Sequence, residues 1–252
     1  MGYETILYAE DGPVATLTLN RPDDGNMFTE TMCHEVRDCI NVVRRETRTR
    51  VLVITGAGDK FFCIGGRKAG MEETRLYPGV LPTLDMYESI ERLQKPVIAA
   101  VNGYALGAGL ELVMSCDIAI TADHAQLGMP EVKVGLPSVI ECALMPNIIG
   151  LMRTRELLLT GDNIDAHEAY RIGLVNQVVP LAELPVAVRR MAQRLASNGP
   201  RALFLQKELL NRWLNLPMDE AIEAGIKSLA MAYATDAPQR AIEAFWARRG
   251  KR

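Results

Sequence analysis

The stretch from Lys95 to Leu112 (KPVIAAVNGYALGAGLEL) constrains the fold of this 252-residue chain most strongly. An apolar, strand-like run ends at Asn102-Gly103, and Gly107-Ala108-Gly109 then begins a helix whose first turn carries Glu111. Backbone N–H groups in the first turn of a helix have no partner within the helix, so they can point at a developing negative charge. The stretch therefore predicts a strand, a turn and a helix start, with a carboxylate close to whatever binds there.

Strand-like and helix-like segments alternate on both sides of this stretch. Apolar runs predict strands at 14–19, 51–55, 97–101 and 117–121. Apolar residues at helical spacing predict one helix that begins at Thr29 and another that includes 86–93. Alternation of this kind is typical of βαβ units around a largely parallel sheet, so the expected class is α/β.

The pattern becomes mostly helical from about Pro146. Asp165 and Glu168 are expected to cap the start of a first helix, and one short strand is expected at 175–179. Four further helices are expected at 181–196, 201–213, 218–234 and 236–247. We divide the chain into a core, residues 1–195, and a helical C-terminal region, residues 196–252. The second part is too thin for a core of its own, so we expect it to pack on the first or on a neighbouring subunit.

Composition excludes several classes of protein. The chain is 48% hydrophobic and 23% charged with a net charge of −3, which argues against nucleic acid as the main partner. No apolar run approaches the ~20 residues of a membrane span, and the N-terminus resembles neither a signal nor a transit peptide. Five scattered cysteines without C-x-x-C spacing indicate thiols in a reducing compartment, so we expect a cytoplasmic protein. Three dispersed histidines predict no metal site.

Common cofactor and nucleophile motifs are absent from the sequence. There is no G-x-G-x-x-G after a strand, no G-x-x-x-x-G-K-[ST] and no G-x-S-x-G. A dinucleotide cofactor, a P-loop and a serine nucleophile are therefore not indicated. Carboxylates and backbone N–H groups remain as the candidate chemistry.

Two glycines and two glutamates supply that chemistry. Gly65-Gly66 follows the strand at 51–55 and allows a ligand to approach the main chain closely, which gives a second possible N–H donor beside the one at Gly107-Ala108-Gly109. Two donors that converge on one oxygen form an oxyanion hole. Taken singly, Gly65-Gly66 could be a simple turn, Glu111 a glutamate that complements a helix dipole, and Glu131 a loop carboxylate.

Together these motifs resemble the crotonase family, the enoyl-CoA hydratase/isomerase superfamily. The resemblance runs almost end to end through TLNRPDDGNMF, FFCIGG, KPVIAAVNGYALGAGLELVMSCDIAIT, LGMPEVKVG, LLLTGDNIDAHEAYRIGLVNQVV and ATDAPQRAIEAF. The third and fifth blocks are the most specific. The family implies an α/β fold with a spiral core of ββα units and a helical C-terminal region that forms trimers.

The resemblance also implies roles for particular residues. Gly66 and Ala108 would donate their N–H groups to a thioester carbonyl, and Ala108 stands where the family usually has glycine. Glu111 and Glu131 match the two catalytic glutamates, whereas Asp117 matches an aspartate expected to be structural. Residues expected to contact the substrate are Ile64, Arg67, Lys68, Pro137, Glu141, Phe245 and Arg248, the last two reaching the coenzyme A of a neighbouring subunit.

Two departures from the family pattern leave the substrate open. Arg67, followed by Lys68, replaces the usual aspartate; the pair could be solvated, contact coenzyme A phosphates, or bind an extra acidic group on the acyl chain. The segment 135–141 is apolar where the family has a glycine-rich stretch. Glu141 within it is interpreted either as a surface residue of a helix or as a third carboxylate facing the pocket.

The function implied by the resemblance is hydration of a 2-enoyl-CoA thioester. The presence of both Glu111 and Glu131 favours it over a Δ3,Δ2-enoyl-CoA isomerase, which needs one carboxylate. The scaffold would also allow a thioester hydrolase, a decarboxylase, or a non-enzymatic protein that binds coenzyme A or RNA. Coenzyme A would enter as part of the substrate, with no separate cofactor, and a homotrimer or a hexamer (a dimer of trimers) is expected.

Overall fold

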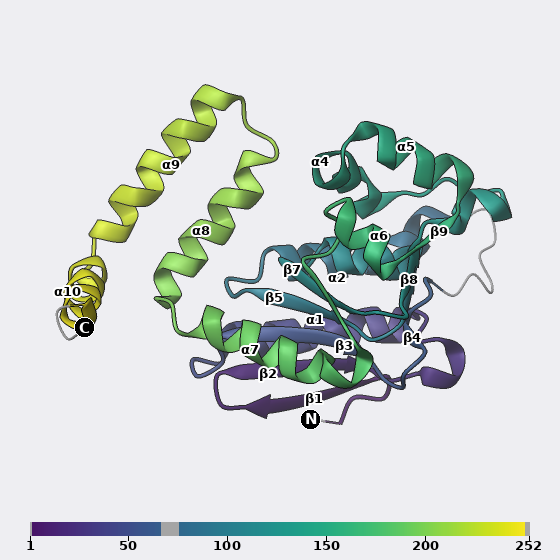
Figure 1. Cartoon of the computed structure of the whole chain (residues 1–252), viewed down its shortest axis with the longest axis horizontal. Helices are drawn as coiled ribbons and strands as arrows, with labels where there is room; N and C mark the ends of the chain where they lie inside the picture. Colours follow the sequence, from purple (N-terminus) through teal and green to yellow (C-terminus); the bar gives the residue numbers. More distant parts are fainter. Residues whose placement is uncertain (1, 67–75, 250–252) are drawn as a thin grey trace.

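A twisted six-stranded sheet forms the centre of the protein, whose computed structural model describes residues 2–66 and 76–249 (Figure 1). Its strands lie in the order β1 (Ile6–Asp11), β2 (Val14–Leu19), β3 (Val51–Gly56), β5 (Val97–Val101), β7 (Ile118–Ala122) and β10 (Gln177–Val179). β1 pairs antiparallel with β2, and the other neighbours are parallel. The largely parallel sheet predicted from the alternation is confirmed.

Both faces of this sheet are covered, which explains why its inner strands are continuously apolar. Leu52 and Ile54 of β3 belong to the core that includes residues of α1 (Glu30–Arg45) and α2 (Leu76–Glu91). Val51 and Val53 of the same strand face the opposite way and pack with α7 (Leu184–Ala196). In Figure 1, α7 crosses one side of the sheet, and α1 and α2 lie on the other. Successive side chains of a strand therefore enter different cores, as the pleat requires.

A second, four-stranded sheet was not predicted. It consists of β4 (Phe61–Cys63), β6 (Tyr104–Leu106), β8 (Gln126–Gly128) and β9 (Asn163–Asp165), in that order. Three residues are too few to show a period of two, so these strands left no signal in the sequence. The prediction of a simple turn between the strand at 97–101 and the Glu111 helix was therefore wrong, because β6 intervenes. β4, β6 and β8 follow β3, β5 and β7 along the chain, so each loop crosses from the large sheet to the small one.

Short helices and turns complete the core and carry several predicted caps. The Thr29 hydroxyl accepts from the Met32 N–H at the start of α1, and Asp165 accepts from the Glu168 N–H at the start of α6. The remaining elements of the core are η1 (Pro22–Asp24), α3 (Ala108–Met114), η3 (Pro130–Val134), η4 (Ile140–Leu144), α4 (Met145–Ile149), α5 (Leu151–Thr160), α6 (Ala166–Arg171) and η5 (Leu181–Glu183).

Three C-terminal helices extend away from the two sheets. They are α8 (Pro200–Trp213), α9 (Met218–Tyr233) and α10 (Ala237–Arg249), and α10 lies at the far end of the molecule (Figure 1). The predicted helices of this region are confirmed, whereas the division of the chain at residue 195 stays a prediction. Within the ranges that the structure describes, no helix has both the length and the apolar character needed to cross a lipid bilayer.

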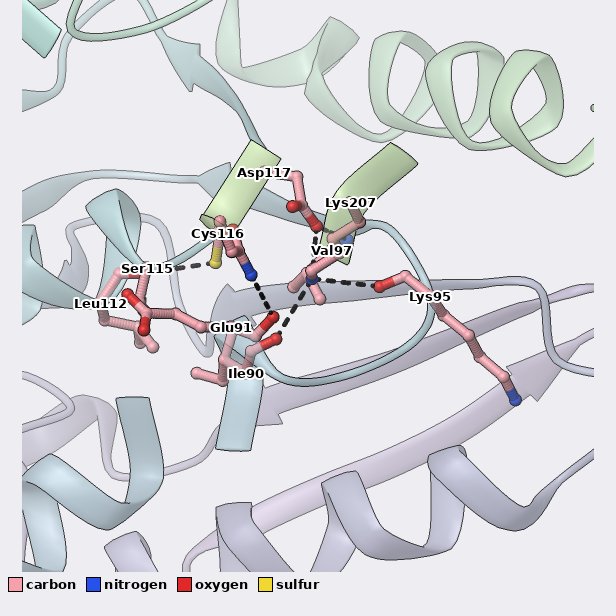
Figure 2. A network of polar contacts seen from close by, with 10 residues as sticks. Ile90, Glu91, Lys95, Val97, Leu112, Ser115, Cys116, Asp117 and Lys207 are labelled. Atoms are coloured by element: carbon pink, nitrogen blue, oxygen red, sulfur yellow. Dashed lines mark hydrogen bonds and ion pairs between the residues drawn. The ribbon is translucent and has the colours of Figure 1, made fainter. Parts of the chain in front are cut away.

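A buried lysine fastens α8 to the core (Figure 2). The Lys207 ammonium donates to the carbonyls of Ile90 and Lys95, each at 3.2 Å, and to Asp117 Oδ2 at 2.7 Å. Asp117 Oδ2 also accepts from the Val97 N–H at 2.7 Å. The Lys207 side chain is only 7% exposed, and that of Asp117 is 27% exposed. These contacts give Asp117 the structural role that was expected.

Replacing Lys207 with methionine should therefore destabilise the protein. Methionine keeps most of the apolar stem but leaves Asp117 and two carbonyls without their cation, which we expect to lower the free energy of unfolding by about 2–3 kcal/mol. Urea unfolding of the full chain measures this change. Lys227→Met is the matched control, because Lys227 pairs with Glu223 on the exposed surface of α9, where such a pair contributes about 0.3–0.5 kcal/mol. Equal effects of the two substitutions would contradict the anchoring role.

Candidate active site

The first turn of α3 lies where three segments meet. Gly107 caps this helix with φ of +54°, a conformation that favours glycine, and a Cβ on it would lie 2.3 Å from Glu131 Oε1. A Cβ on Gly109 would lie 2.0 Å from the Cys63 carbonyl oxygen at the end of β4. Only glycine at both positions lets α3 approach η3 and β4 this closely. Glycine is therefore needed at Gly107 and Gly109 for close packing as well as for the turn.

The segments that carry the two predicted backbone donors lie side by side. Gly65 has φ of +108°, and a Cβ built on it would lie 3.8 Å from the Ala108 nitrogen and 3.4 Å from the Leu106 carbonyl oxygen. The chain at Gly65-Gly66 therefore runs beside the start of α3. Gly66 is exposed, and Ala108 is half-buried as the first residue of that helix. Both segments belong to loops that leave the large sheet.

Glu111 points into the protein and not toward solvent. Its side chain is 4% exposed, and its Oε1 accepts from the Cys142 N–H at 3.2 Å. Burial raises the pKa of Glu111 to about 8, and the negative charge of Glu131 acts in the same direction. Backbone N–H groups of Cys142 and Glu141 oppose this rise by stabilising the carboxylate. An exposed glutamate that merely complements the helix dipole does not fit this position.

Glu131 also lies close to the first turn of α3. It belongs to η3, it is half-buried, and its Oε1 lies over Gly107, the residue before Ala108. Its Oε2 accepts from the Ser138 hydroxyl at 3.0 Å. Glu131 therefore lies at the helix start that also carries Glu111. Ser138 was not singled out in the sequence, although it lies in the segment that departs from the family pattern.

Tyr87 is a further residue that sequence reasoning missed. Its hydroxyl donates to the Ala108 carbonyl at 2.6 Å, and its ring packs edge-on against Phe28. Burial, followed by the charge of Glu111, raises the pKa of Tyr87 well above its usual value, so the hydroxyl stays protonated. Tyr87 therefore ties α2 to the first turn of α3. In the sequence it is indistinguishable from the other core positions of its helix.

The other predicted contact residues are dispersed. Ile64 packs on the loop before α1, since a Cβ on Gly25 would lie 2.5 Å from Ile64 Cδ1. Pro137 is exposed beside Ser138, and Glu141 is 8% exposed in η4, so the interpretation of Glu141 as a surface residue was wrong. Phe245 is 53% exposed on α10, which lies away from the two sheets in the single chain (Figure 1). Arg67 and Lys68 lie outside the described residues, as does the side chain of Arg248.

Cys63 and Cys142 lie beside these groups through their main-chain atoms. In the described part of the chain, no three or more His, Cys, Asp or Glu side chains are arranged to hold a metal ion. All five cysteines are free thiols. Carboxylates and main-chain donors are thus the groups that the site offers for chemistry.

A family model described as enoyl-CoA hydratase/isomerase matches residues 9–251. The chain belongs to this family. It is 36% identical over 255 residues to the crotonyl-CoA hydratase of Syntrophomonas wolfei subsp. wolfei, covering 99% of this chain and 97% of that one. It is also 34% identical to the short-chain-enoyl-CoA hydratase of Clostridium acetobutylicum, with coverage of 97% and 95%.

The fold agrees with this membership. The crystal structure of enoyl-CoA hydratase from Bacillus anthracis superposes with a TM-score of 0.94 at 32% identity, covering 97% of each chain. The crotonase-like α/β fold expected from the resemblance is therefore confirmed, together with its helical C-terminal region. The small sheet that the sequence did not reveal is part of that same agreement.

Proposed function

We propose that this member of the enoyl-CoA hydratase/isomerase family is an enoyl-CoA hydratase, which adds water across the 2,3 double bond of a 2-enoyl-CoA thioester. One observation carries the proposal: Glu131 Oε1 lies beside Gly107, the residue before Ala108, at the same helix start that carries the buried Glu111. Two carboxylates beside an oxyanion hole are what hydration requires. The hydratase names of relatives that span nearly the full chain support the same reaction.

The chemistry follows from the conjugated thioester. Its carbonyl withdraws electrons from the alkene, so water attacks carbon 3 and negative charge develops on the carbonyl oxygen. The N–H groups of Gly66 and Ala108 would stabilise that charge, because they are fixed in place before the reaction. Protonation of carbon 2 then converts this enolate back to a thioester. The net reaction places a hydroxyl on carbon 3 and a hydrogen on carbon 2, both from water.

The two glutamates divide the proton transfers. We assign Glu111 as the base that takes a proton from water and Glu131 as the acid that protonates carbon 2. A proton then passes from Glu111 through solvent to Glu131, which restores both carboxyl groups for the next turnover. Glu111 must be ionised to act as the base, so its raised pKa requires it to lose a proton first. The Ser138 hydroxyl holds the Glu131 carboxyl in one orientation. The addition is redox-neutral and these side chains supply its proton transfers, so we propose no separate cofactor.

The remaining proposals concern substrate and assembly. We propose that the substrate carries a short acyl chain, because two relatives are named for crotonyl-CoA and short-chain enoyl-CoA. A homotrimer, or a hexamer of two trimers, is supported by apolar side chains exposed on α8, on α9 and in the turn between them, which would be costly to leave in water. These side chains are Trp213, Leu214, Met218, Ile222, Ile226 and Leu229. Five free thiols support a cytoplasmic location.

A pair of assays tests the reaction. Purified protein is incubated with crotonyl-CoA, and we expect the absorbance of the conjugated enoyl thioester to fall as water adds. The same protein is then given a 3-enoyl-CoA, for which an isomerase would produce a gain of that absorbance. Gain with the second substrate and no loss with the first would support the isomerase instead. No change with either substrate would contradict the proposed function for short chains.

A further inference from the structure

The Gly66 donor belongs to a peptide unit whose direction is set by a hydrogen bond on its other side. The Gly65 carbonyl, which is part of that unit, accepts from the Phe28 N–H at 2.9 Å, and the Cys63 thiol lies 3.7 Å from the same oxygen. In a trans peptide the N–H points away from the carbonyl, so the Gly66 N–H is directed away from Phe28. The main chain of Phe28 therefore orients the Gly66 donor.

The Ala108 donor is held from two sides. The Gly107 carbonyl accepts from the Leu110 N–H at 2.8 Å and from the Glu111 N–H at 3.0 Å. The Ala108 N–H shares a peptide unit with that carbonyl, so it points out of the N-terminal end of α3. The next peptide unit carries the Ala108 carbonyl, which accepts from the Tyr87 hydroxyl at 2.6 Å. Both peptide units that meet at Ala108 are thus fixed, one by its own helix and one by Tyr87.

Tyr87 and Phe28 connect these two arrangements. Their rings meet edge-on, with 6.4 Å between centroids and 69° between planes, and both side chains are buried. An isolated β-bridge also joins Phe28 to Gly66. One member of the ring pair therefore holds the Gly66 donor through its main chain, and the other holds Ala108 through its hydroxyl.

A buried asparagine anchors the loop that carries Phe28. Asn26 has φ of +53°, a conformation that asparagine adopts more readily than most residues. Its amide nitrogen donates to the Ala57 carbonyl at 3.0 Å and to the Phe61 carbonyl at 2.9 Å. Phe28 therefore lies two residues from a point that is fixed to the start of β4, which holds its N–H in place.

Packing alone does not explain the hydroxyl of Tyr87. The residue belongs to the buried apolar core together with Met86 and Ile90 of the same helix, where phenylalanine would fill nearly the same space without a polar atom. A buried hydroxyl is costly unless it is hydrogen-bonded, and the partner of this one is a main-chain atom of Ala108. A carbonyl can only accept, so the hydroxyl donates and ties Ala108 to α2.

We propose that Tyr87 is a positioning residue for the oxyanion hole: its hydroxyl holds the Ala108 main chain, and its ring packs on Phe28, whose N–H orients the Gly66 donor. The role rests on the proposed function, because that reaction develops negative charge on the thioester oxygen. Donors stabilise such charge best when they are fixed before the reaction, and a small displacement lowers the rate strongly. Tyr87 acts through Ala108 and does not touch the reacting atoms.

The first experiment measures kcat and KM for crotonyl-CoA in Tyr87→Phe, which removes the hydroxyl and keeps the ring. We expect kcat to fall by about 10–100-fold, because the Ala108 donor remains but is no longer held in place. KM should change much less, since the weakened interaction is strongest in the transition state. Tyr8→Phe is the matched control: the Tyr8 hydroxyl donates to Glu10 at 2.7 Å on the edge strand β1, so its removal should leave both constants unchanged.

A second readout needs no turnover. Butyryl-CoA has the thioester carbonyl but no double bond, so it can bind without reacting, and an isotope label on its carbonyl makes the infrared stretching band visible. Hydrogen bonds from the oxyanion hole weaken the carbonyl bond, so the band should lie at lower frequency in the wild-type complex than in water. In Tyr87→Phe it should broaden and move back toward its position in water. Phe28→Leu keeps the N–H on Gly65 but removes the ring contact, so it should move the band in the same direction, and it replaces Tyr87→Phe if that variant does not fold.

The two readouts separate the positioning role from the proposed function. A wild-type protein that leaves crotonyl-CoA unchanged but shifts the butyryl-CoA band would reject the hydratase alone, and loss of that shift in Tyr87→Phe would still support the positioning role. A kcat and a carbonyl band in Tyr87→Phe equal to those of the wild type would overturn it. A lower kcat with an unchanged band would overturn it as well, because Tyr87 would then act on something other than the donors.

Discussion

Replacing Glu111 with glutamine should lower kcat for hydration of crotonyl-CoA by about 10²–10⁴-fold. The amide cannot take a proton from water, but its oxygen can still accept from the Cys142 N–H, so the turn around it should remain in place. Glu131→Gln should cause a loss of similar size, because carbon 2 would then lack its acid. Steady-state kinetics and thermal unfolding of the same samples separate lost chemistry from lost fold. Glu220→Gln on the exposed start of α9 is the control and should retain full activity.

The pH profile gives this prediction a second test. Because burial raises the pKa of Glu111 to about 8, the base form becomes dominant only above that pH, and kcat/KM of the wild type should rise toward pH 8. The rising limb should be missing from the residual activity of Glu111→Gln. A variant that keeps both its rate and its rising limb would exclude Glu111 as the base.

Replacing Ala108 with proline should reduce kcat by about 10²–10³-fold by deleting one oxyanion donor. A backbone N–H is normally beyond the reach of mutagenesis, but Ala108 is the first residue of α3, where proline is tolerated and its N–H is not needed by the helix. The substitution therefore removes the donor from a position that can accept it. KM should change less than kcat, since the lost interaction is strongest in the transition state.

The control for this experiment is Ala108→Gly, which restores the residue usual in the family and keeps the N–H. It should hydrate crotonyl-CoA at a rate close to that of the wild type. Equal unfolding midpoints for the proline and glycine variants would show that the fold survives both. If the proline variant were as active as the glycine variant, the Ala108 N–H would not be a donor to the thioester.

The positions of the catalytic candidates could be predicted because their signals are local. Gly107-Ala108-Gly109 and Glu111 lie within one turn, and the glycines are required by contacts as close as that between Gly109 and Cys63. The long strands could likewise be predicted, because both of their faces are buried and their residues are therefore continuously apolar. Membership of the family then connected Gly66 and Glu131, which are distant in sequence, to the same site.

Other parts of the site depend on contacts that a sequence does not display. Tyr87 is one of several core residues in its helix, and only the fold shows that its hydroxyl meets the Ala108 carbonyl. The short strands of the second sheet have no period of their own. The sequence left Glu141 either on the surface of a helix or facing the pocket, and only the fold shows that it is buried in η4. The direction of the η4 amides follows from the positive φ of Ile140, which nothing in its side chain predicts.

The buried ion pair between α8 and the core sets a limit on how the chain can be shortened. A fragment that ended at residue 195 would keep Asp117 and the carbonyls of Ile90 and Lys95 but would lose the lysine that binds all three. Such a fragment would have to fold with the Asp117 carboxylate, directly before β7, bound by the Val97 N–H but without a cation. The C-terminal helices are therefore not a detachable appendage, because the core is chemically complete only when α8 has docked.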